Sequence, residues 1–256
     1  MPTWSSDQYL KFNRERTQPA IDLAARIDLA APAQIADLGC GPGNSTTVLA
    51  QRWPGAKLLG VDNSKAMLAS AQRDFPDPTW VEADIASWAP TRTFEVVFSN
   101  ATLQWVPDHA TLLPRLFALV ATGGAFAMQV PNNLHHSGHR LMRELAVSPE
   151  WCRFFPQPTR EWHVESPAFY YDCFAALASR VELWETDYIH VLNGPDGIVE
   201  WYRGTGLRPW LEALPDEATQ SRFIEDYTRL IAEAYPRQAD GRVLFPFRRL
   251  FVIAYR

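Results

Sequence analysis

The chain has little cysteine, little lysine and no long hydrophobic run among its 256 residues. The three cysteines are scattered at Cys40, Cys152 and Cys173, so they form neither a CxxC pair nor a disulfide framework, which suits a reducing compartment. No apolar stretch approaches the ~20 residues of a transmembrane helix, and the first residues lack the pattern of a signal peptide. We therefore expect a cytoplasmic protein without a membrane partner.

Lysine is scarce although positive charge is not. Only three of the 24 cationic residues are lysines, and the others are arginines. A coding bias toward arginine explains such a ratio, and so do arginines that act as planar forks for anionic groups. The net charge of −5 argues against a protein whose whole surface attracts nucleic acid, so we expect no nucleic-acid partner.

The length and the apolar content indicate a folded protein with one large core. At ~100–200 residues per domain, 256 residues suggest one large domain or a core domain with a smaller appendage. An apolar fraction of 47% excludes a disordered chain. We expect a single domain over residues 1–256.

Short apolar segments alternate with helical ones through the first half of the chain, and two longer strands follow. We expect strands at 34–39, 57–62, 79–84, 94–100, 125–130, 181–192 and 244–255, and helices at 44–53, 63–75 and 108–120. Asn63 or Ser64 would cap the second of these helices, and Gly123 and Gly124 would follow the third. This alternation predicts an α/β fold with a doubly wound, mostly parallel, seven-stranded sheet.

Three segments do not follow the alternation and are expected to form a helical cap. They cover approximately residues 1–30, 131–167 and 193–242. In the first of them, Pro19 is expected near the start of a helix, because proline is favoured at the first helical position.

The stretch ADLGCGPGNST (36–46) is the most informative motif. A strand ends at Asp37-Leu38-Gly39, and the chain then turns through Gly41 and Gly43 into a helix. Glycines are needed where backbone approaches a ligand closely or takes a positive φ. A dinucleotide-binding GxGxxG motif would need a third glycine at position 44, which is Asn44 here, so a nicotinamide cofactor is disfavoured.

ADLGCGPG resembles motif I of the class I S-adenosylmethionine (SAM)-dependent methyltransferases, which have a Rossmann-like fold. The resemblance implies that Asp62 binds the ribose hydroxyls and that Asp84 reaches the adenine amino group, with the backbone N–H of Ile85 facing the ring. Asn100 lies in FSNATLQWV (98–106), which matches the segment that flanks the methionine part of SAM in this family. The residues assigned to SAM by this resemblance are Asp37, Gly39, Gly41, Gly43, Asp62, Asn63, Asp84, Ile85 and Asn100.

The remaining arginine-rich segments indicate an acidic methyl acceptor. A carboxylate with a pKa near ~4 is already an anion at neutral pH, so it needs cationic contacts rather than a general base. YLKFNRERTQPA (9–20), ATLQWVPDH (101–109), TGLRPWL (205–211) and RLFVIA (249–254) resemble the methyltransferases that act on trans-aconitate. That resemblance implies a monomethyl ester and S-adenosylhomocysteine as products. The expected substrate-binding residues are Arg16, Arg249, Arg208, Tyr9, Trp105 and Gln104.

Other interpretations stay open. The acceptor could be a different small or carrier-bound acid, and the chain could be a non-catalytic SAM-binding regulator. Each arginine could form an ordinary surface ion pair, Trp105 could only pack, and a strand-end aspartate could only cap a turn. His135, His136 and His139 have metal-like spacing, but no further ligand is evident nearby, so no metal is expected. A monomer or a weak homodimer is expected.

Overall fold

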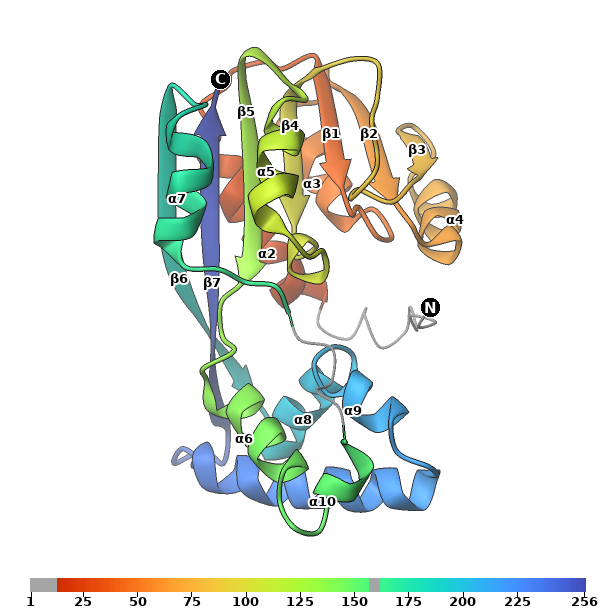
Figure 1. The fold of residues 1–256 in the computed structure, drawn as a ribbon, viewed down its shortest axis with the longest axis vertical. Helices are drawn as coiled ribbons and strands as arrows, with labels where there is room; N and C mark the ends of the chain where they lie inside the picture. Colours follow the sequence, from red (N-terminus) through yellow and green to blue (C-terminus); the bar gives the residue numbers. More distant parts are fainter. Residues whose placement is uncertain (1–12, 157–161) are drawn as a thin grey trace. The chain divides into compact units, whose positions relative to one another are not determined.

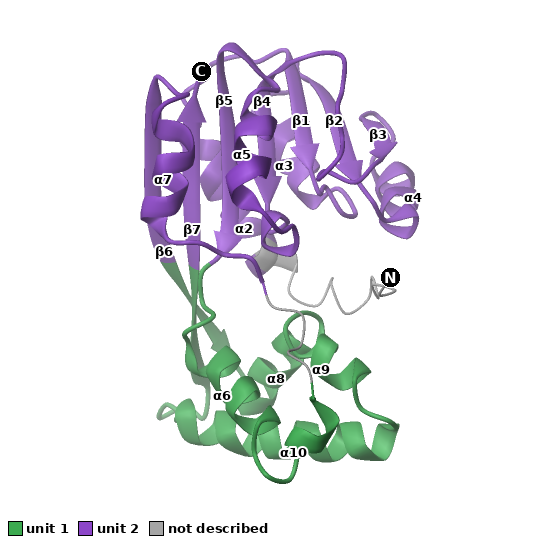
Figure 2. Ribbon diagram, in the orientation of Figure 1, with its two compact units in different colours: residues 1–13, 132–161, 187–248 green, residues 14–131, 162–186, 249–256 purple. Residues whose placement is uncertain are grey.

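The computed structural model describes residues 13–156 and 162–256, which form two compact units (Figure 2). Among the described residues, the sheet unit comprises 14–131, 162–186 and 249–256, and the helical unit comprises 132–156 and 187–248. Two long strands, β6 (Arg180–Leu192) and β7 (Val243–Tyr255), contribute residues to both units.

The described residues form one seven-stranded sheet with the order β3-β2-β1-β4-β5-β7-β6. The other strands are β1 (Gln34–Leu38), β2 (Lys57–Asp62), β3 (Thr79–Glu82), β4 (Phe94–Asn100) and β5 (Val120–Pro131). β1 to β5 pair in parallel, whereas β7 runs antiparallel to β5. The predicted mostly parallel seven-stranded α/β fold is confirmed. The strand order reverses between β1 and β4, where open α/β sheets bind their ligands.

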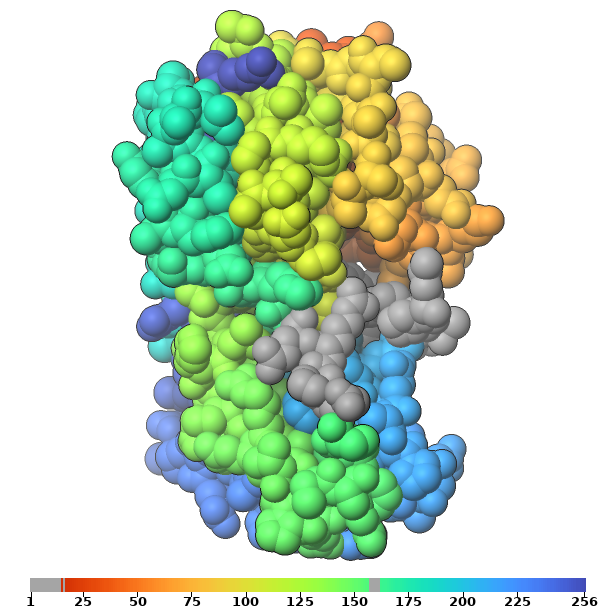
Figure 3. All heavy atoms as spheres, in the orientation of Figure 1, coloured from red at the N-terminus to blue at the C-terminus, as the bar shows by residue number. Residues whose placement is uncertain are grey.

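Helices cover both faces of the sheet in the sheet unit. They are α2 (Asn13–Arg26), α3 (Asn44–Arg52), α4 (Lys65–Asp74), α5 (His109–Phe117) and α7 (Pro167–Ala175), with a 3₁₀ turn, η1, at Leu103–Trp105. Figure 1 shows α5 and α7 in front of the sheet and α2 and α3 behind it. Side chains of α5 and α7 cover the sheet on the near face (Figure 3).

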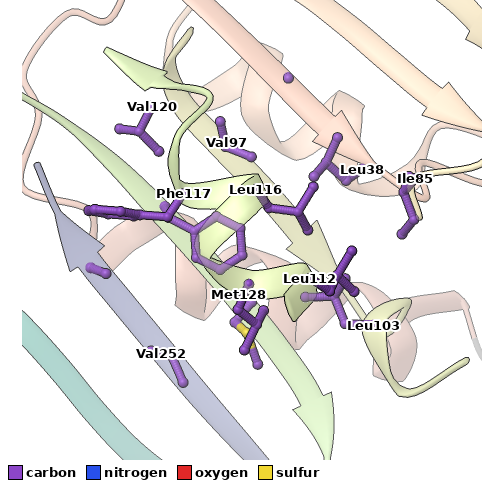
Figure 4. Packing of buried hydrophobic residues seen from close by; sticks show 14 of the residues in the cluster. Leu38, Ile85, Val97, Leu103, Leu112, Leu116, Phe117, Val120, Met128 and Val252 are labelled. Carbon is purple, nitrogen blue, oxygen red and sulfur yellow. The ribbon is translucent and has the colours of Figure 1, made fainter. Parts of the chain in front are cut away.

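The main core lies between the sheet and the α5–α7 layer. Leu112, Leu116 and Phe117 on α5 recur at helical spacing and are buried against strand residues such as Val97 and Met128 (Figure 4). Burying each such side chain contributes roughly 1.5–3 kcal/mol. This face of the sheet is apolar, so the polar residues of β1, β4 and β5 must lie on the other face or at the strand ends.

The helical unit is built around buried aromatic rings. Its helices are α6 (Ser137–Ala146), α8 (Pro195–Arg203), α9 (Arg208–Glu212) and α10 (Glu217–Ala234), with a 3₁₀ turn, η2, at Cys152–Phe154. Trp151 packs edge-on against Phe223 of α10, and Trp201 of α8 contacts Phe245. The hydroxyl of Tyr227 donates to the carbonyl oxygen of Gly138, which joins α10 to α6 at 3.0 Å.

Three local predictions were wrong. Pro19 lies inside α2 instead of at its start, and its buried ring offsets part of the cost of the missing N–H. β3 ends at Glu82, so Asp84 lies two residues beyond the strand. β5 begins at Val120 and includes both expected loop glycines. An added Cβ at Gly124 would lie 2.5 Å from the carbonyl oxygen of Glu95, so close strand pairing requires this glycine.

Among the residues described, no helix combines the length and the apolar character that crossing a membrane would take. The three cysteines are free thiols, with Cys40 buried and Cys152 exposed.

Candidate active site

The loop between β1 and α3 carries three glycines in left-handed backbone conformations. Their φ angles are +71° at Gly39, +54° at Gly41 and +95° at Gly43. A Cβ at Gly39 would lie 2.0 Å from the Cγ2 of Thr102, so packing alone excludes a side chain there. At Gly41 no described heavy atom lies within 4 Å of an added Cβ. The loop therefore presents bare backbone to open space at Gly41.

Asp62, the last residue of β2, holds this loop in place. Its Oδ2 accepts the backbone N–H of Gly41 at 2.9 Å, and its Oδ1 accepts the N–H of Ser64 at 2.8 Å. A carboxylate oxygen has more than one acceptor site, so both oxygens can accept a further hydrogen bond. Asp62 thus fixes the glycine loop and remains able to bind a hydroxyl donor.

Asp37 is the buried acid of the glycine motif. Its Oδ2 accepts from the hydroxyl groups of Ser45 and Thr46 on α3, at 2.7 and 2.6 Å. Its Oδ1 is buried and has no hydrogen-bond partner among the described residues. Burial raises the pKa of Asp37 to about 6, the hydroxyl hydrogen bonds oppose this shift, and the charge of Asp62 adds to it.

Polar side chains continue from Asp37 along the carboxyl ends of the strands. Asn100 of β4 and Gln129 of β5 are Cα partners, and Asn100 lies two residues beyond Phe98, the partner of Asp37. Alternate residues share a face of a sheet, so Asp37, Asn100 and Gln129 face the same side. We call these three residues the polar row.

The polar row has unsatisfied hydrogen-bonding capacity. The Oδ1 of Asn100 and the Nε2 of Gln129 are buried without a hydrogen-bond partner in the described part of the chain, as is the Oδ1 of Asp37. Each such buried polar group costs about 1–3 kcal/mol. Three of them in one row can complete their hydrogen bonds with a polar ligand or with bound water.

Arg249 of β7 extends the polar row. Its side chain is 4% exposed, and its Nη1 donates to the Oε1 of Gln129 at 3.2 Å. The neighbouring Arg248 is half-buried and forms two hydrogen bonds with Asp187, at 3.0 and 2.8 Å. Of the two adjacent arginines, Arg249 is therefore the one that contacts the polar row.

The segment after β4 packs against the glycine loop. The Oγ1 of Thr102 donates to the carbonyl oxygen of Gly39 at 3.0 Å. Gln104 is buried, and its Nε2 donates to the carbonyl oxygen of Ala101 at 2.7 Å, while its Oε1 has no hydrogen-bond partner among described residues. Trp105 is half-buried and packs edge-on against Trp162. The segment therefore brings a further acceptor, Gln104 Oε1, to the described part of the site.

The loop after β3 forms a tight turn around Asp84. The exposed carboxylate of Asp84 accepts the N–H of Ala86 at 2.9 Å, so the residue caps a turn. Ile85 is buried, and its carbonyl oxygen accepts from the guanidinium group of Arg115 on α5. Asn63, after β2, is exposed.

The structure separates the remaining predicted residues. Tyr9 lies outside the described residues, and Arg16 lies in α2 without a described side chain. Arg208 belongs to the helical unit, at the start of α9, where its Nε lies 2.6 Å from a carboxylate oxygen of Glu212. An ion pair within its own helix is thus observed for Arg208.

His135, His136 and His139 of the helical unit do not share one environment. His139 is buried edge-on against Tyr202, and burial lowers its pKa to about 3. His135 and His136 line a pocket of about 530 Å³ together with Tyr235. In the described ranges, no group of three histidine, cysteine or acidic side chains is placed to hold a metal ion.

Sequence reasoning missed two residues of the site. Gln129 has a signal in hindsight, because it is the polar residue in the otherwise apolar strand AFAMQV (125–130). Thr102 has no such signal, since only the fold brings it against Gly39.

Comparisons with known proteins agree with the fold. A family described as "Methyltransferase domain" matches residues 35–124. A trans-aconitate 2-methyltransferase of Methylobacterium nodulans is 50% identical over 257 residues, which cover 100% of this chain and 99% of the relative. One from Azoarcus sp. is 47% identical, with 100% of both chains covered.

Solved structures with low sequence identity show the same fold. The YcgJ protein of Bacillus subtilis has a TM-score of 0.59 at 14% identity, covering 93% of this chain and 99% of its own. A phosphoethanolamine N-methyltransferase 2 of Haemonchus contortus, in complex with phosphomonomethylethanolamine and S-adenosylhomocysteine, has a TM-score of 0.56 at 17% identity. It covers 93% of this chain and 52% of its own.

The raised pKa of Asp37 makes stability depend on pH. The folded pKa of about 6 lies above the ordinary value of 3.8, so the folded state binds the proton more tightly, and this contribution is lost as pH rises through 6. Urea unfolding of the wild type and of Asp37→Asn at pH 5 and 7.5 should show it. From pH 5 to pH 7.5, we expect the free energy of unfolding of Asp37→Asn to rise by about 1 kcal/mol relative to that of the wild type. A difference that is the same at both pH values would contradict the assignment.

Proposed function

Because the chain belongs to the trans-aconitate 2-methyltransferase family, we propose that it transfers the methyl group of SAM to one carboxylate of trans-aconitate. The products are the monomethyl ester and S-adenosylhomocysteine. The observation that carries the proposal is the polar row, whose three unsatisfied buried atoms follow the carboxyl ends of the strands at which the open glycine loop begins.

The residues present fit SAM. Its methionine part is both cationic and anionic, so it can supply a donor to the Oδ1 atoms of Asp37 and Asn100. The bare backbone of Gly41 leaves room for close approach. Asp62 keeps acceptor capacity for two ribose hydroxyls on a carboxylate that Gly41 and Ser64 already orient.

The adenine ring would lie at the loop after β3. The backbone N–H of Ile85 donates to no described residue, so it can donate to a ring nitrogen. Asp84 is exposed on the same turn and can accept from the adenine amino group. Asn63 follows Asp62 and Gly43 follows the open part of the glycine loop, so both are proposed to line the SAM site.

SAM supplies an electrophilic methyl group on a sulfonium, and the protein has to align the acceptor and exclude water. A carboxylate is ionised at neutral pH, so we propose no general base. Holding donor and acceptor in line replaces the entropy of a bimolecular encounter and contributes up to about 7–11 kcal/mol of the barrier reduction.

Arg249 is the principal acceptor-binding residue in this proposal. A guanidinium group binds a carboxylate through two parallel hydrogen bonds, and Gln129 already fixes one of its nitrogens. Gln104 and Trp105, on the segment after β4, complete the acceptor side of the sheet unit. We propose Arg16, Arg208 and Tyr9 as further contacts to the polycarboxylate.

The remaining organisation is also a proposal. We propose that residues 1–256 act as one catalytic domain, with cap segments at approximately 1–30, 131–167 and 193–242. A monomer or a weak homodimer acting on a small-molecule acid in the cytoplasm agrees with the three free thiols.

An acceptor panel tests the proposed function. We expect mass spectrometry of separate reactions of SAM with trans-aconitate, cis-aconitate, citrate and isocitrate to show one added methyl group in the reaction with trans-aconitate. A methyl ester of another acid in the panel would replace the substrate and keep the reaction. Tight SAM binding without any methylated product would instead support a SAM-binding regulator.

Arg249→Lys tests the acceptor contact. Lysine keeps the charge but cannot form two parallel hydrogen bonds to a carboxylate. Because the loss of one charged hydrogen bond costs about 1.5–3 kcal/mol, we expect the KM for trans-aconitate to rise about tenfold or more. The affinity for SAM should be unchanged. Arg248→Lys is the matched control, because Arg248 is the adjacent arginine and is paired with Asp187. Equal KM values for the two variants would exclude Arg249 as an acceptor contact.

A further inference from the structure

His109 is a buried, ionisable residue with no role in the proposed site. It is the first residue of α5 and is 3% exposed. Its Nε2 lies 3.0 Å from the carbonyl oxygen of Leu103, and its Nδ1 lies 3.1 Å from the hydroxyl oxygen of Tyr170 on α7. Both ring nitrogens therefore have a hydrogen-bond partner within the sheet unit.

The partner of Nε2 determines which ring nitrogen carries a proton. The carbonyl oxygen of Leu103 can only accept, so the proton must sit on Nε2 of His109. In a neutral ring Nδ1 is then an acceptor, and the hydroxyl of Tyr170 must donate to it. The Tyr170 oxygen in turn accepts the backbone N–H of Glu165 at 3.1 Å. We call this chain of three hydrogen bonds the His109 relay.

At Leu103 the relay reaches the segment after β4, which packs against the glycine loop. Leu103 lies between Thr102, which is bonded to the carbonyl oxygen of Gly39, and Gln104, which carries an unsatisfied buried oxygen. The carbonyl oxygen of Gln104 also accepts the N–H of His163 at 2.8 Å. The segment after β4 is thus fixed from α5, from α7 and from the chain around residues 163–165.

We propose that His109 and Tyr170 are positioning residues for methyl transfer. They touch neither substrate nor SAM. They act through Leu103 by holding Thr102 against the glycine loop and Gln104 toward the acceptor. The proposal rests on the proposed function, because positioning matters only if this site carries out a reaction. A displacement near 1 Å of a positioned group can cost about a hundredfold in rate.

Two substitutions of His109 separate positioning from packing. The amide nitrogen of glutamine reaches the place of Nε2, so His109→Gln can still donate to Leu103. The shorter asparagine amide reaches only the place of Nδ1, so His109→Asn keeps the contact with Tyr170 and loses the one with Leu103. Tyr170→Phe removes only the hydroxyl group and tests the relay if His109→Asn does not fold.

We expect kcat to fall about tenfold or more in His109→Asn. His109→Gln should retain more activity than His109→Asn, and Tyr170→Phe should lose less than His109→Asn. The calorimetric affinity for SAM should change by a much smaller factor than kcat in all three. If kcat falls equally in the two His109 variants, and in proportion to the fall in their melting temperatures, the role is packing alone and the proposal is overturned. Wild-type kcat in all three variants would also overturn it.

Long-range ¹H–¹⁵N spectra of the histidine rings test the relay without any reaction. The signal that disappears in His109→Gln should show a proton on Nε2 and an Nδ1 that accepts a hydrogen bond, and a proton on Nδ1 would overturn the relay. If the wild-type protein methylates no acceptor in the panel, the proposed function fails, and these spectra still decide whether the relay exists.

Discussion

The hydrogen bond from the backbone N–H of Gly41 to the carboxylate of Asp62 is the contact on which the site depends. It fixes the loop after β1 to the end of β2, and Thr102 fixes the same loop to the segment after β4. Three strand ends are thereby joined at the point where the strand order reverses. Because these contacts exist without any ligand, little reorganisation is needed on binding, which favours affinity.

The polar row lowers the stability of the free protein and can strengthen the binding of a ligand. Asp37, Asn100 and Gln129 bury atoms without hydrogen-bond partners in the described structure, and the pKa of Asp37 is raised as a result of burial. Such groups lower stability when alone and strengthen binding when a ligand satisfies them. Arg249 joins the row although the net charge is −5, so a local buried cation, and not the overall charge, is suited to a polycarboxylate.

Features that depend on neighbouring residues could be predicted from the sequence. Strand and helix alternation, the glycine loop and the acid ending β2 are local patterns, and the sheet confirms the predicted fold. Pro19 and Gly124 were misplaced because burial and strand pairing override local preference. The contacts of Arg249 with Gln129 and of His109 with Tyr170 join positions 120 and 61 residues apart. No local pattern encodes such pairs, so sequence reasoning proposed Arg249 without Gln129 and left His109 unassigned.

The central claim is that SAM occupies the open space at Gly41. Calorimetric titration of SAM into Gly41→Ala tests it most directly, since the added methyl group meets no described atom of the protein and would meet only the ligand. Gly241→Ala is the control, because Gly241 also has a left-handed backbone, at φ +82°, and its added methyl group also meets no described atom. We expect the affinity to fall about tenfold or more, or 1.4 kcal/mol, in Gly41→Ala alone. Equal affinity in the two variants would contradict the account.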